Sequence, residues 1–401
     1  MKTRKLRVAA VVPGVIPSTL LCVMYPLLRL ERAGALRAEI LHECYSSIRS
    51  CAGIDVGVFC RNFEPFNRGF VDHFIAAGVP YVYDIDDNLL AISKDTPGGA
   101  YYHDGGRPEM LRHYISHAAL VRVYSPSMLA EISGLTDRAR LVQTPIEWSM
   151  IEKPRRRRAG PVRLVYATSR NEDALSLVFM EALERILAEY GDAVRMHFIG
   201  YNPPNLRGKP NVVQSPFMPD YERFVRSFCS AGYDIGLAPM VDDLFHRGKT
   251  NNKFREYGAA RIAGIYSDVP LYAASVEPGE TGILVHNTPA AWYDAMKTLI
   301  DDATLRKKIQ ERAWGTLRQH YRVEEFDGIL LQQITLVAGK NPAPAQHQHP
   351  ASAPSVAVRS PGLIGRMLAL RPQKIIPLLF FCQDWMRWPF VVARLRWRNR
   401  S

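Results

Sequence analysis

Two lysines and a glutamate between positions 249 and 256 have the types and spacing needed to bind a nucleotide diphosphate. Lys249 and Lys253 are four residues apart, which puts them on one face of a helix, and Glu256 lies one turn further along. Lysine ammonium groups attract a diphosphate, and a carboxylate can accept hydrogen bonds from the diol of a ribose. The same residues also fit a solvated helix face with a Lys253–Glu256 ion pair, and spacing alone leaves both interpretations open.

The surrounding residues predict the elements that would position these side chains. Residues 232–240 form an apolar run of strand length, residues 249–261 have a helical pattern, and residues 262–267 predict the next strand. Thr250 or Asn251 is the expected N-cap of the helix. In parallel α/β sheets, ligands bind beyond the carboxyl ends of strands, against helix N-termini whose unpaired N–H groups favour anions. The pattern therefore predicts an anion site where this helix begins.

The sequence around this helix resembles a known family. Residues 256–260, 265–272 and 279–285 are similar to the nucleotide-sugar half of GT-B glycosyltransferases. The similarity is closest to the retaining family-four (glycosyl transferases group 1) enzymes of bacterial surface-polysaccharide synthesis. It extends over residues 6–321 and is strong from residue 232. The resemblance implies an α/β protein with two Rossmann-like domains facing a cleft. It also implies sugar transfer, with retention, from a UDP- or GDP-linked co-substrate to a glycan or lipid-linked acceptor, without a cofactor.

The resemblance also implies roles for individual residues. Glu256 matches the glutamate that binds the ribose. The expected catalytic residues, which neutralise the leaving diphosphate, are Lys249, Lys253 and Arg170. Further expected donor-binding residues are Thr250, Asn251, Asn252 and Tyr257. The chain departs from the family where a second glutamate contacts the donor sugar, because that position is Gly248 here. Lys249 is expected to take over part of that role.

Three acidic residues follow an apolar strand pattern in the first half of the chain. Asp84, Asp86 and Asp87 come directly after residues 79–83. They could hold a divalent metal on a nucleotide diphosphate, as in GT-A glycosyltransferases, or bind acceptor hydroxyls in a GT-B enzyme, or simply cap local structure. We favour acceptor-side groups without a metal, and His103, in the Gly- and Tyr-rich loop that follows, is a further acceptor-side candidate.

The positive charge of the chain is concentrated in two places. The 401 residues carry a net charge of +12. Residues 355–401 hold nine Lys and Arg residues and one acidic residue, residues 155–158 are all arginine, and the remainder is neutral. A charge confined to short stretches argues against nucleic-acid binding by the folded body. Three of the six tryptophans, Trp385, Trp388 and Trp397, lie in the basic C-terminal stretch. Together these residues fit an anionic membrane surface, the alternative being a tail that packs on the protein.

The six cysteines indicate a cytoplasmic protein. Their positions show neither metal-ligand spacing nor a disulfide framework. The N-terminus has no ordinary signal-peptide pattern, and no apolar run approaches the length of a membrane span. We therefore expect a cytoplasmic enzyme that associates peripherally with the inner face of the membrane.

Composition and pattern predict five segments. They are an acceptor domain (1–147), a linker (148–161), a nucleotide-sugar domain (162–338), a disordered tether (339–355) and a membrane-associating tail (356–401). The predicted function is glycosyl transfer. The rival interpretations are a non-catalytic GT-B-like nucleotide-sugar-binding or scaffold protein, which Gly248 keeps open, and a metal-dependent GT-A transferase.

Overall fold

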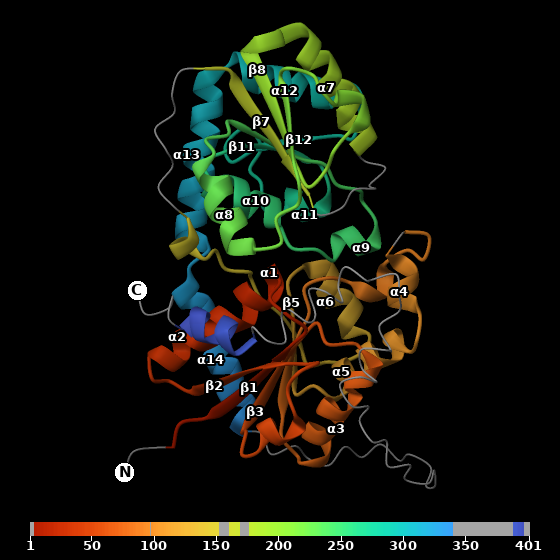
Figure 1. Cartoon of the computed structure of the whole chain (residues 1–401), viewed down its shortest axis with the longest axis vertical. Coiled ribbons are helices and arrows are strands. Elements are labelled where there is room, and N and C mark those ends of the chain that lie inside the picture. The colour runs from red at the N-terminus through yellow and green to blue at the C-terminus, as the bar shows by residue number, and fades with distance from the viewer. Residues whose placement is uncertain (1–3, 97, 152–159, 169–175, 340–387, 397–401) are drawn as a thin grey trace. The chain divides into compact units, whose positions relative to one another are not determined.

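The chain folds into two compact units, each built on one six-stranded parallel sheet (Figure 1). The first unit contains Met1–Thr144 and Val323–Ser401, and the second contains Pro145–Arg322. This arrangement confirms the α/β class that the alternating strand and helix patterns predicted. The computed structural model describes residues 4–96, 98–151, 160–168, 176–339 and 388–396.

In the first unit the order of strands reverses direction between β1 and β3. The order is β2-β1-β3-β4-β5-β6, and every pairing is parallel. The strands are β1 (Arg7–Val12), β2 (Arg37–His42), β3 (Val56–Cys60), β4 (Tyr81–Asp84), β5 (Leu120–Val123) and β6 (Ala139–Leu141). β3 is buried along its whole length and β1 at all but its first residue, as expected for a sheet covered on both faces. The reversal defines the place where doubly wound sheets bind ligands.

Helices connect these strands and cover the sheet. They are α1 (Pro17–Thr19), the π-helical turn η1 (Leu20–Met24), α2 (Tyr25–Arg32), η2 (Ile48–Cys51), η3 (Pro65–Asn67), α3 (Arg68–Ala76), η4 (Leu89–Ala91), α4 (Gly99–His103), α5 (Arg107–His117), α6 (Pro126–Ser133) and α14 (Val323–Gly339). The turn η1 directly precedes Tyr25-Pro26, where the proline has no N–H to give to the helical ladder.

Helix α14 belongs to the first unit, which corrects the expected boundary of the second domain. Arg29 on α2 donates two hydrogen bonds to Asp327, with N···O distances of 2.6 and 2.8 Å. The guanidinium of Arg122 on β5 lies 4.8 Å from the centre of the Phe326 ring. The sequence placed residues 323–338 with the preceding helices because a helix that returns to an earlier sheet has no local sequence signature.

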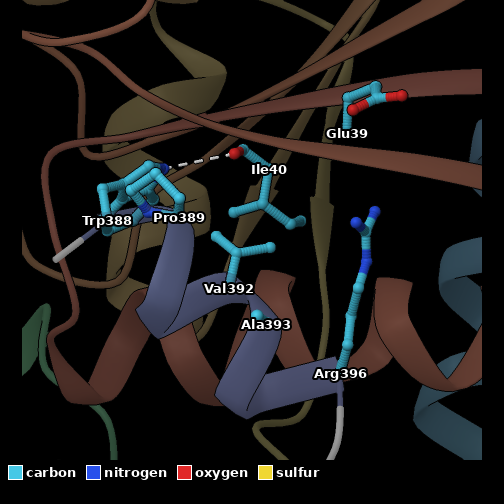
Figure 2. A pocket seen from close by; sticks show the side chains of 7 residues that line it. All are labelled: Glu39, Ile40, Trp388, Pro389, Val392, Ala393 and Arg396. Carbon is cyan, nitrogen blue, oxygen red and sulfur yellow. Dashed lines mark hydrogen bonds between the residues drawn. The ribbon is translucent and has the colours of Figure 1, made fainter.

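Residues 388–396 form a helix on the free edge of β2 (Figure 2). The indole N–H of Trp388 donates to the carbonyl of Ile40 at 3.3 Å, and the guanidinium of Arg396 donates to the carbonyl of Ala38 at 2.8 Å. These bonds occupy an edge that would otherwise offer unpaired backbone groups to another chain. A hollow of about 550 Å³ lies between strand and helix, and its lining is Glu39, Ile40, Trp388, Pro389, Val392, Ala393 and Arg396.

Part of the predicted tail therefore packs on the protein. The other two tryptophans of that stretch, Trp385 and Trp397, lie outside the described residues, as does the expected tether. None of the helices in the described ranges combines the length and apolar content that crossing a bilayer requires.

The second unit has the strand order β12-β11-β10-β7-β8-β9. Its strands are β7 (Val162–Ala167), β8 (Val194–Ile199), β9 (Val212–Ser215), β10 (Ile235–Ala238), β11 (Ala263–Ser267) and β12 (Ile283–Val285). Here the order reverses between β7 and β10, so the carboxyl end of β10 lies at the predicted binding edge.

Helices of the second unit pack on this sheet around a buried core that includes Trp292, Leu299 and Met296. They are η5 (Trp148–Met150), α7 (Ser176–Tyr190), η6 (Gly191–Ala193), η7 (Pro204–Leu206), α8 (Tyr221–Ser230), α9 (Leu244–Arg247), α10 (Asn252–Ala259), α11 (Pro270–Ala273), α12 (Pro289–Asp301) and α13 (Ala303–His320). Most of the expected linker, residues 152–159, lies outside the described residues, whereas η5 packs within this unit through a hydrogen bond from Trp148 Nε1 to the carbonyl of Tyr321.

Candidate functional site

Strand β10 and helix α10 form the predicted strand–loop–helix unit of the second sheet. Tyr257 on α10 is fully buried, and its hydroxyl donates to the carbonyl of Leu237 on β10 at 2.7 Å. A Cβ atom at Gly236 would lie 2.5 Å from the Tyr257 ring, so only glycine lets the helix approach the strand this closely. Tyr257 is therefore a packing residue, and its expected role in contacting the donor is wrong.

Helix α10 begins at Asn252, and Asn251, one of the two predicted N-cap residues, occupies that position. The side chain of Asn251 does not cap the helix but joins neighbouring segments. Its amide nitrogen donates to the hydroxyls of Ser275 at 2.9 Å and Tyr321 at 2.8 Å, and its oxygen accepts from Arg255 Nε at 3.0 Å. We therefore assign Asn251 to holding the start of α10 in place rather than to contacting the donor.

Arg255 anchors the same turn and was not identified from the sequence. Its guanidinium is buried and donates to the carbonyl of Pro145 at 3.0 Å and to the side-chain oxygen of Asn252. The Asn252 oxygen also accepts from the hydroxyl of Thr250 at 2.8 Å. The only sequence signal was its spacing, because Arg255 lies four residues after Asn251, one helical turn away.

Lys253 and Glu256 form the ion pair that the spacing allowed. The Lys253 Nζ atom lies 2.7 Å from Glu256 Oε2, and the two side chains are 26 % and 14 % exposed. The ammonium and carboxylate thus lie together on the first turns of α10, within reach of solvent. A neutral, partly exposed pair at a helix N-terminus can rearrange around a ligand with little electrostatic cost.

Lys249 lies outside the helix and faces a different neighbour. Its Nζ atom is 4.2 Å from the centre of the Phe245 ring, a cation–π contact that limits where the ammonium can go. Asp242 accepts from the guanidinium of Arg247, which lowers the pKa of Asp242. Gly248, the position that lacks the family glutamate, is the C-cap residue of α9.

A partly buried hydrogen-bond network fixes the carboxyl ends of β10, β11 and β12. The hydroxyl of Ser267 accepts from the backbone N–H of Met240 at 2.8 Å and donates to Asn287 Oδ1 at 2.7 Å. Asn287 Nδ2 in turn donates to the carbonyl of Met240 at 2.8 Å, and its oxygen accepts from Trp292 Nε1 at 3.4 Å. The loop that leads from β10 towards α10 therefore starts from a fixed position. Arg170, the remaining expected catalytic residue, lies outside the described residues.

In the first unit, Asp84 corrects an expectation. Asp84 and Arg122 are opposite each other on β4 and β5, both have no exposed surface, and their charged atoms are 3.1 Å apart. The hydroxyl of Tyr124 donates to the same carboxylate at 2.6 Å. Burial raises the pKa of Asp84 to about 6, against the opposing effects of Arg122 and Tyr124. Asp84 has no surface to offer an acceptor, and its role is structural.

Asp86 and Asp87 lie at the carboxyl edge of the same sheet and share one partner. Arg61 Nη1 is 2.9 Å from Asp86 Oδ1 and 3.0 Å from Asp87 Oδ2. The Asp87 side chain is 18 % exposed and that of Asp86 is 12 % exposed, so both retain some accessible surface. His103 bonds through Nε2 to the carbonyl of Ile92, which ties its loop together.

A comparison with known families identifies part of the second unit. Residues 162–302 match the family model described as Glycosyl transferases group 1. This segment runs from β7 to α12 and contains the Lys253–Glu256 pair. None of the curated proteins matches the chain in sequence.

Solved structures share the fold over more than four fifths of the chain. Sucrose-phosphate synthase from Thermosynechococcus elongatus has a TM-score of 0.62 at 12 % identity, covering 83 % of this chain and 100 % of that one. A glycosyltransferase from Rickettsia africae has a TM-score of 0.61 at 11 % identity, covering 84 % and 99 %. HepE from Anabaena, in complex with UDP and glucose, has a TM-score of 0.60 at 12 % identity, covering 82 % and 100 %.

These likenesses establish the GT-B fold. The GT-A alternative is therefore wrong, since two separate parallel sheets of this topology are not the GT-A architecture. The chain has the GT-B fold, and its residues 162–302 match the family model of the group 1 glycosyl transferases.

Proposed function

We propose that the protein transfers a sugar, with retention, from a UDP- or GDP-linked donor to a glycan or lipid-linked acceptor in bacterial surface-polysaccharide synthesis. The observation that carries this proposal is the group 1 domain match, because it spans α10 and the Lys253–Glu256 pair. The complex of HepE with UDP and glucose supports a nucleotide-sugar donor for this fold.

In the proposed complex the diphosphate lies at the N-terminus of α10. The unpaired N–H groups there carry partial positive charge, and Lys253 adds a full charge on the same turn. Glu256 binds Lys253 through one oxygen and accepts a ribose hydroxyl at the other. As the bond to the sugar breaks through an oxocarbenium-like state, negative charge grows on the diphosphate, and Lys249, Lys253 and Arg170 stabilise it.

Asp86 and Asp87 are the proposed acceptor-side groups of the first unit. Both side chains retain some accessible surface, and both contact Arg61, which follows β3 at the strand reversal where doubly wound sheets bind ligands. A phosphate oxygen of the leaving group helps to remove the acceptor proton, so the proposal needs no separate protein base. His103 remains a predicted acceptor-side residue whose imidazole first has to leave the Ile92 carbonyl.

The test is turnover of nucleotide sugars by the full chain. UDP-glucose and GDP-mannose are incubated with the protein and a panel of glycan and lipid-linked acceptors, and release of UDP or GDP is measured. Acceptor-dependent release by the wild type, lost in Lys253→Ala and retained in Lys308→Ala, supports the proposal. Lys308, which is on α13, is the matched control because its ammonium forms an ion pair with Glu280, as the ammonium of Lys253 does with Glu256. If the protein binds the nucleotide but turns over no donor with any acceptor, the non-catalytic alternative is favoured. The family glutamate that Gly248 replaces is the reason to test for it.

We also propose that the basic C-terminal stretch binds an anionic membrane surface. Residues 355–401 carry nine basic residues, and Phe390 on the described helix is 75 % exposed. Each basic residue near an anionic leaflet contributes about 1 kcal/mol. The wild type should sediment with vesicles that contain phosphatidylglycerol, weakly at high salt, and should ignore pure phosphatidylcholine. Failure to bind the anionic vesicles at low salt contradicts this proposal.

A further inference from the structure

The first unit gathers charged side chains from three loops at the carboxyl edge of its sheet. Ser18 lies in α1 after β1, Arg61 follows β3, and Asp86 and Asp87 follow β4. Arg61 joins them, because its Nη1 atom contacts both carboxylates and lies 3.4 Å from the Ser18 hydroxyl. The strand order reverses between β1 and β3, so this cluster occupies the ligand-binding position of a doubly wound sheet.

The backbone of Arg61 is strained at this point. Its φ of 57° lies in the left-handed region that residues other than glycine rarely adopt. The conformation is held by its own N–H, which donates to the carbonyl of Asp84 at 3.0 Å, and by the two carboxylates that bind its guanidinium. Strain of this kind persists where the surroundings impose it, and it concentrates at binding and catalytic sites.

An aromatic cluster begins at Phe63, two residues after this arginine. The rings of Phe63 and Tyr102 are 5.6 Å apart, and those of Tyr101 and Tyr102 are 5.3 Å apart. Tyr101 is fixed, since its hydroxyl donates to Glu64 and the guanidinium of Arg107 lies 3.9 Å from its ring centre. Phe63 and Tyr102 are partly exposed, so this cluster is not a closed core.

Tyr102 connects the aromatic cluster to the charged one. The Tyr102 ring packs on Phe63, which lies only two residues after Arg61 in the chain. Burial opposes the charge of Arg61, whereas Asp86, Asp87 and then Tyr102 raise the pKa of its guanidinium. No residue that the structure describes forms a hydrogen bond with the Tyr102 hydroxyl. A partly exposed ring with an available hydroxyl therefore packs on a residue two positions after Arg61, the arginine that binds both carboxylates.

We propose that Phe63 and Tyr102 form a platform on which one sugar ring of the acceptor glycan lies, with Arg61 positioning Asp86 and Asp87 to bind its hydroxyls. This inference rests on the proposed function for the identity of the ligand as a glycan. One face of a pyranose is lined by C–H bonds and packs on the negative face of an aromatic ring. Its hydroxyls lie around the edge of the ring, where carboxylates accept and the tyrosine hydroxyl both donates and accepts. The juxtaposition of ring, phenol and carboxylates fits a sugar better than it fits a purely apolar or purely anionic ligand.

The test measures sugar binding without any donor. Methyl glycosides of glucose, galactose, mannose and N-acetylglucosamine are titrated into the full-length protein and followed by saturation-transfer NMR. At least one should bind the wild type. Tyr102→Ala should weaken that binding about tenfold, whereas Tyr102→Phe, which keeps the ring, should stay within about threefold, the range of one weak hydrogen bond. Phe390→Ala is the control, because it removes an exposed aromatic ring outside this cluster.

Each outcome decides the proposal independently of turnover. If none of the four glycosides binds the wild type, or if Tyr102→Ala binds as the wild type does, the platform is wrong. If Tyr102→Ala is unfolded by circular dichroism, Phe63→Leu makes the same comparison with the ring replaced by an aliphatic side chain. Where turnover is found, Tyr102→Ala should raise the KM for the acceptor and leave the KM for the donor unchanged. Glycoside binding without any turnover contradicts the proposed enzyme function but leaves the platform standing.

Discussion

The two units place charged residues after strands in opposite ways. In the first unit, Asp84 and Arg122 form an ion pair with no exposed surface, on strands that lie side by side. In the second unit, Lys253 and Glu256 form an ion pair on the first turns of α10, with side chains that solvent reaches. In the sequence Asp84 and the Lys253–Glu256 pair all look like candidate site residues, because they follow apolar strand patterns. Burial separates them, since a group without surface cannot contact a substrate.

The buried and the partly exposed ion pair also differ in the free energy that is lost when one partner is removed. Two charges withdrawn from water depend entirely on each other, so removing one leaves the other without compensation. A partly exposed pair exchanges each partner for water at small cost. A residue of the first kind supports the fold, whereas a residue of the second kind is available for a ligand.

Breaking the buried pair should have the largest effect on stability. Asp84→Asn leaves the Arg122 charge buried and uncompensated, which should lower the free energy of unfolding of the first unit by roughly 3–5 kcal/mol. Lys253→Ala should lower that of the second unit by less than about 1 kcal/mol. Urea denaturation monitored by circular dichroism gives both values. A cost below about 1 kcal/mol for Asp84→Asn would mean that the pair is not the structural element described here.

The edge of β2 provides a second contrast, between the two faces of one short helix. Trp388 is buried against β2, while Phe390 two residues later is exposed. Trp388→Ala should cost about 3 kcal/mol of stability and promote self-association through the uncovered edge. Phe390→Ala should change stability by no more than about 0.5 kcal/mol. Thermal unfolding measures the loss of stability, and size-exclusion chromatography measures self-association. If Trp388→Ala and Phe390→Ala have the same stability and the same oligomeric state, the helix does not cover β2.

A buried carboxyl in the first unit should make stability depend on pH. Burial raises the pKa of Glu43 from 4.5 to about 8, although Asn62 donates a hydrogen bond to it at 2.7 Å. Because the folded pKa is the higher one, this contribution to stability is complete below pH 4.5 and is lost as the pH rises towards 8. Glu43→Gln cannot ionise, so between pH 5 and pH 8 its free energy of unfolding should rise relative to that of the wild type by roughly 3–4 kcal/mol. Denaturation curves of the wild type and of Glu43→Gln are measured at both pH values. The same difference in free energy of unfolding between the two proteins at pH 5 and at pH 8 would contradict a protonated Glu43.

The sequence was informative where its periodicity is strong. β10, α10 and β11 follow in the order that the pattern predicted. The strands that it did not reveal, β2, β9 and β12, are all at the edges of their sheets. An edge strand has one neighbour and partial burial, so its sequence signal is weak: β9 has two polar residues among four, and the apolar run of β12 is only three residues long. Residues 37–42, for example, begin with Arg37 and include Glu39.

The candidate site was predicted in part, for a different reason. The Lys253–Glu256 pair follows from helical spacing, which is a local property. Burial of Asp84 and of Tyr257 depends on strands and helices distant in sequence, and the positioning role of Arg255 depends on Pro145, more than a hundred residues away. Local patterns list the chemical groups, but only the packed structure shows which of them have surface to offer.

The most direct test of the account is whether the Lys253–Glu256 pair contributes to the affinity of the protein for a nucleotide. Isothermal titration of UDP and GDP into the full-length protein is compared with Lys253→Ala, Glu256→Gln and the control Lys308→Ala. A charge-assisted hydrogen bond is worth roughly 1.5–3 kcal/mol, so the first two variants should each weaken binding about tenfold or more, and the control should bind as the wild type does. Unchanged nucleotide affinity in both folded variants would contradict the assignment of α10 as the donor-binding helix.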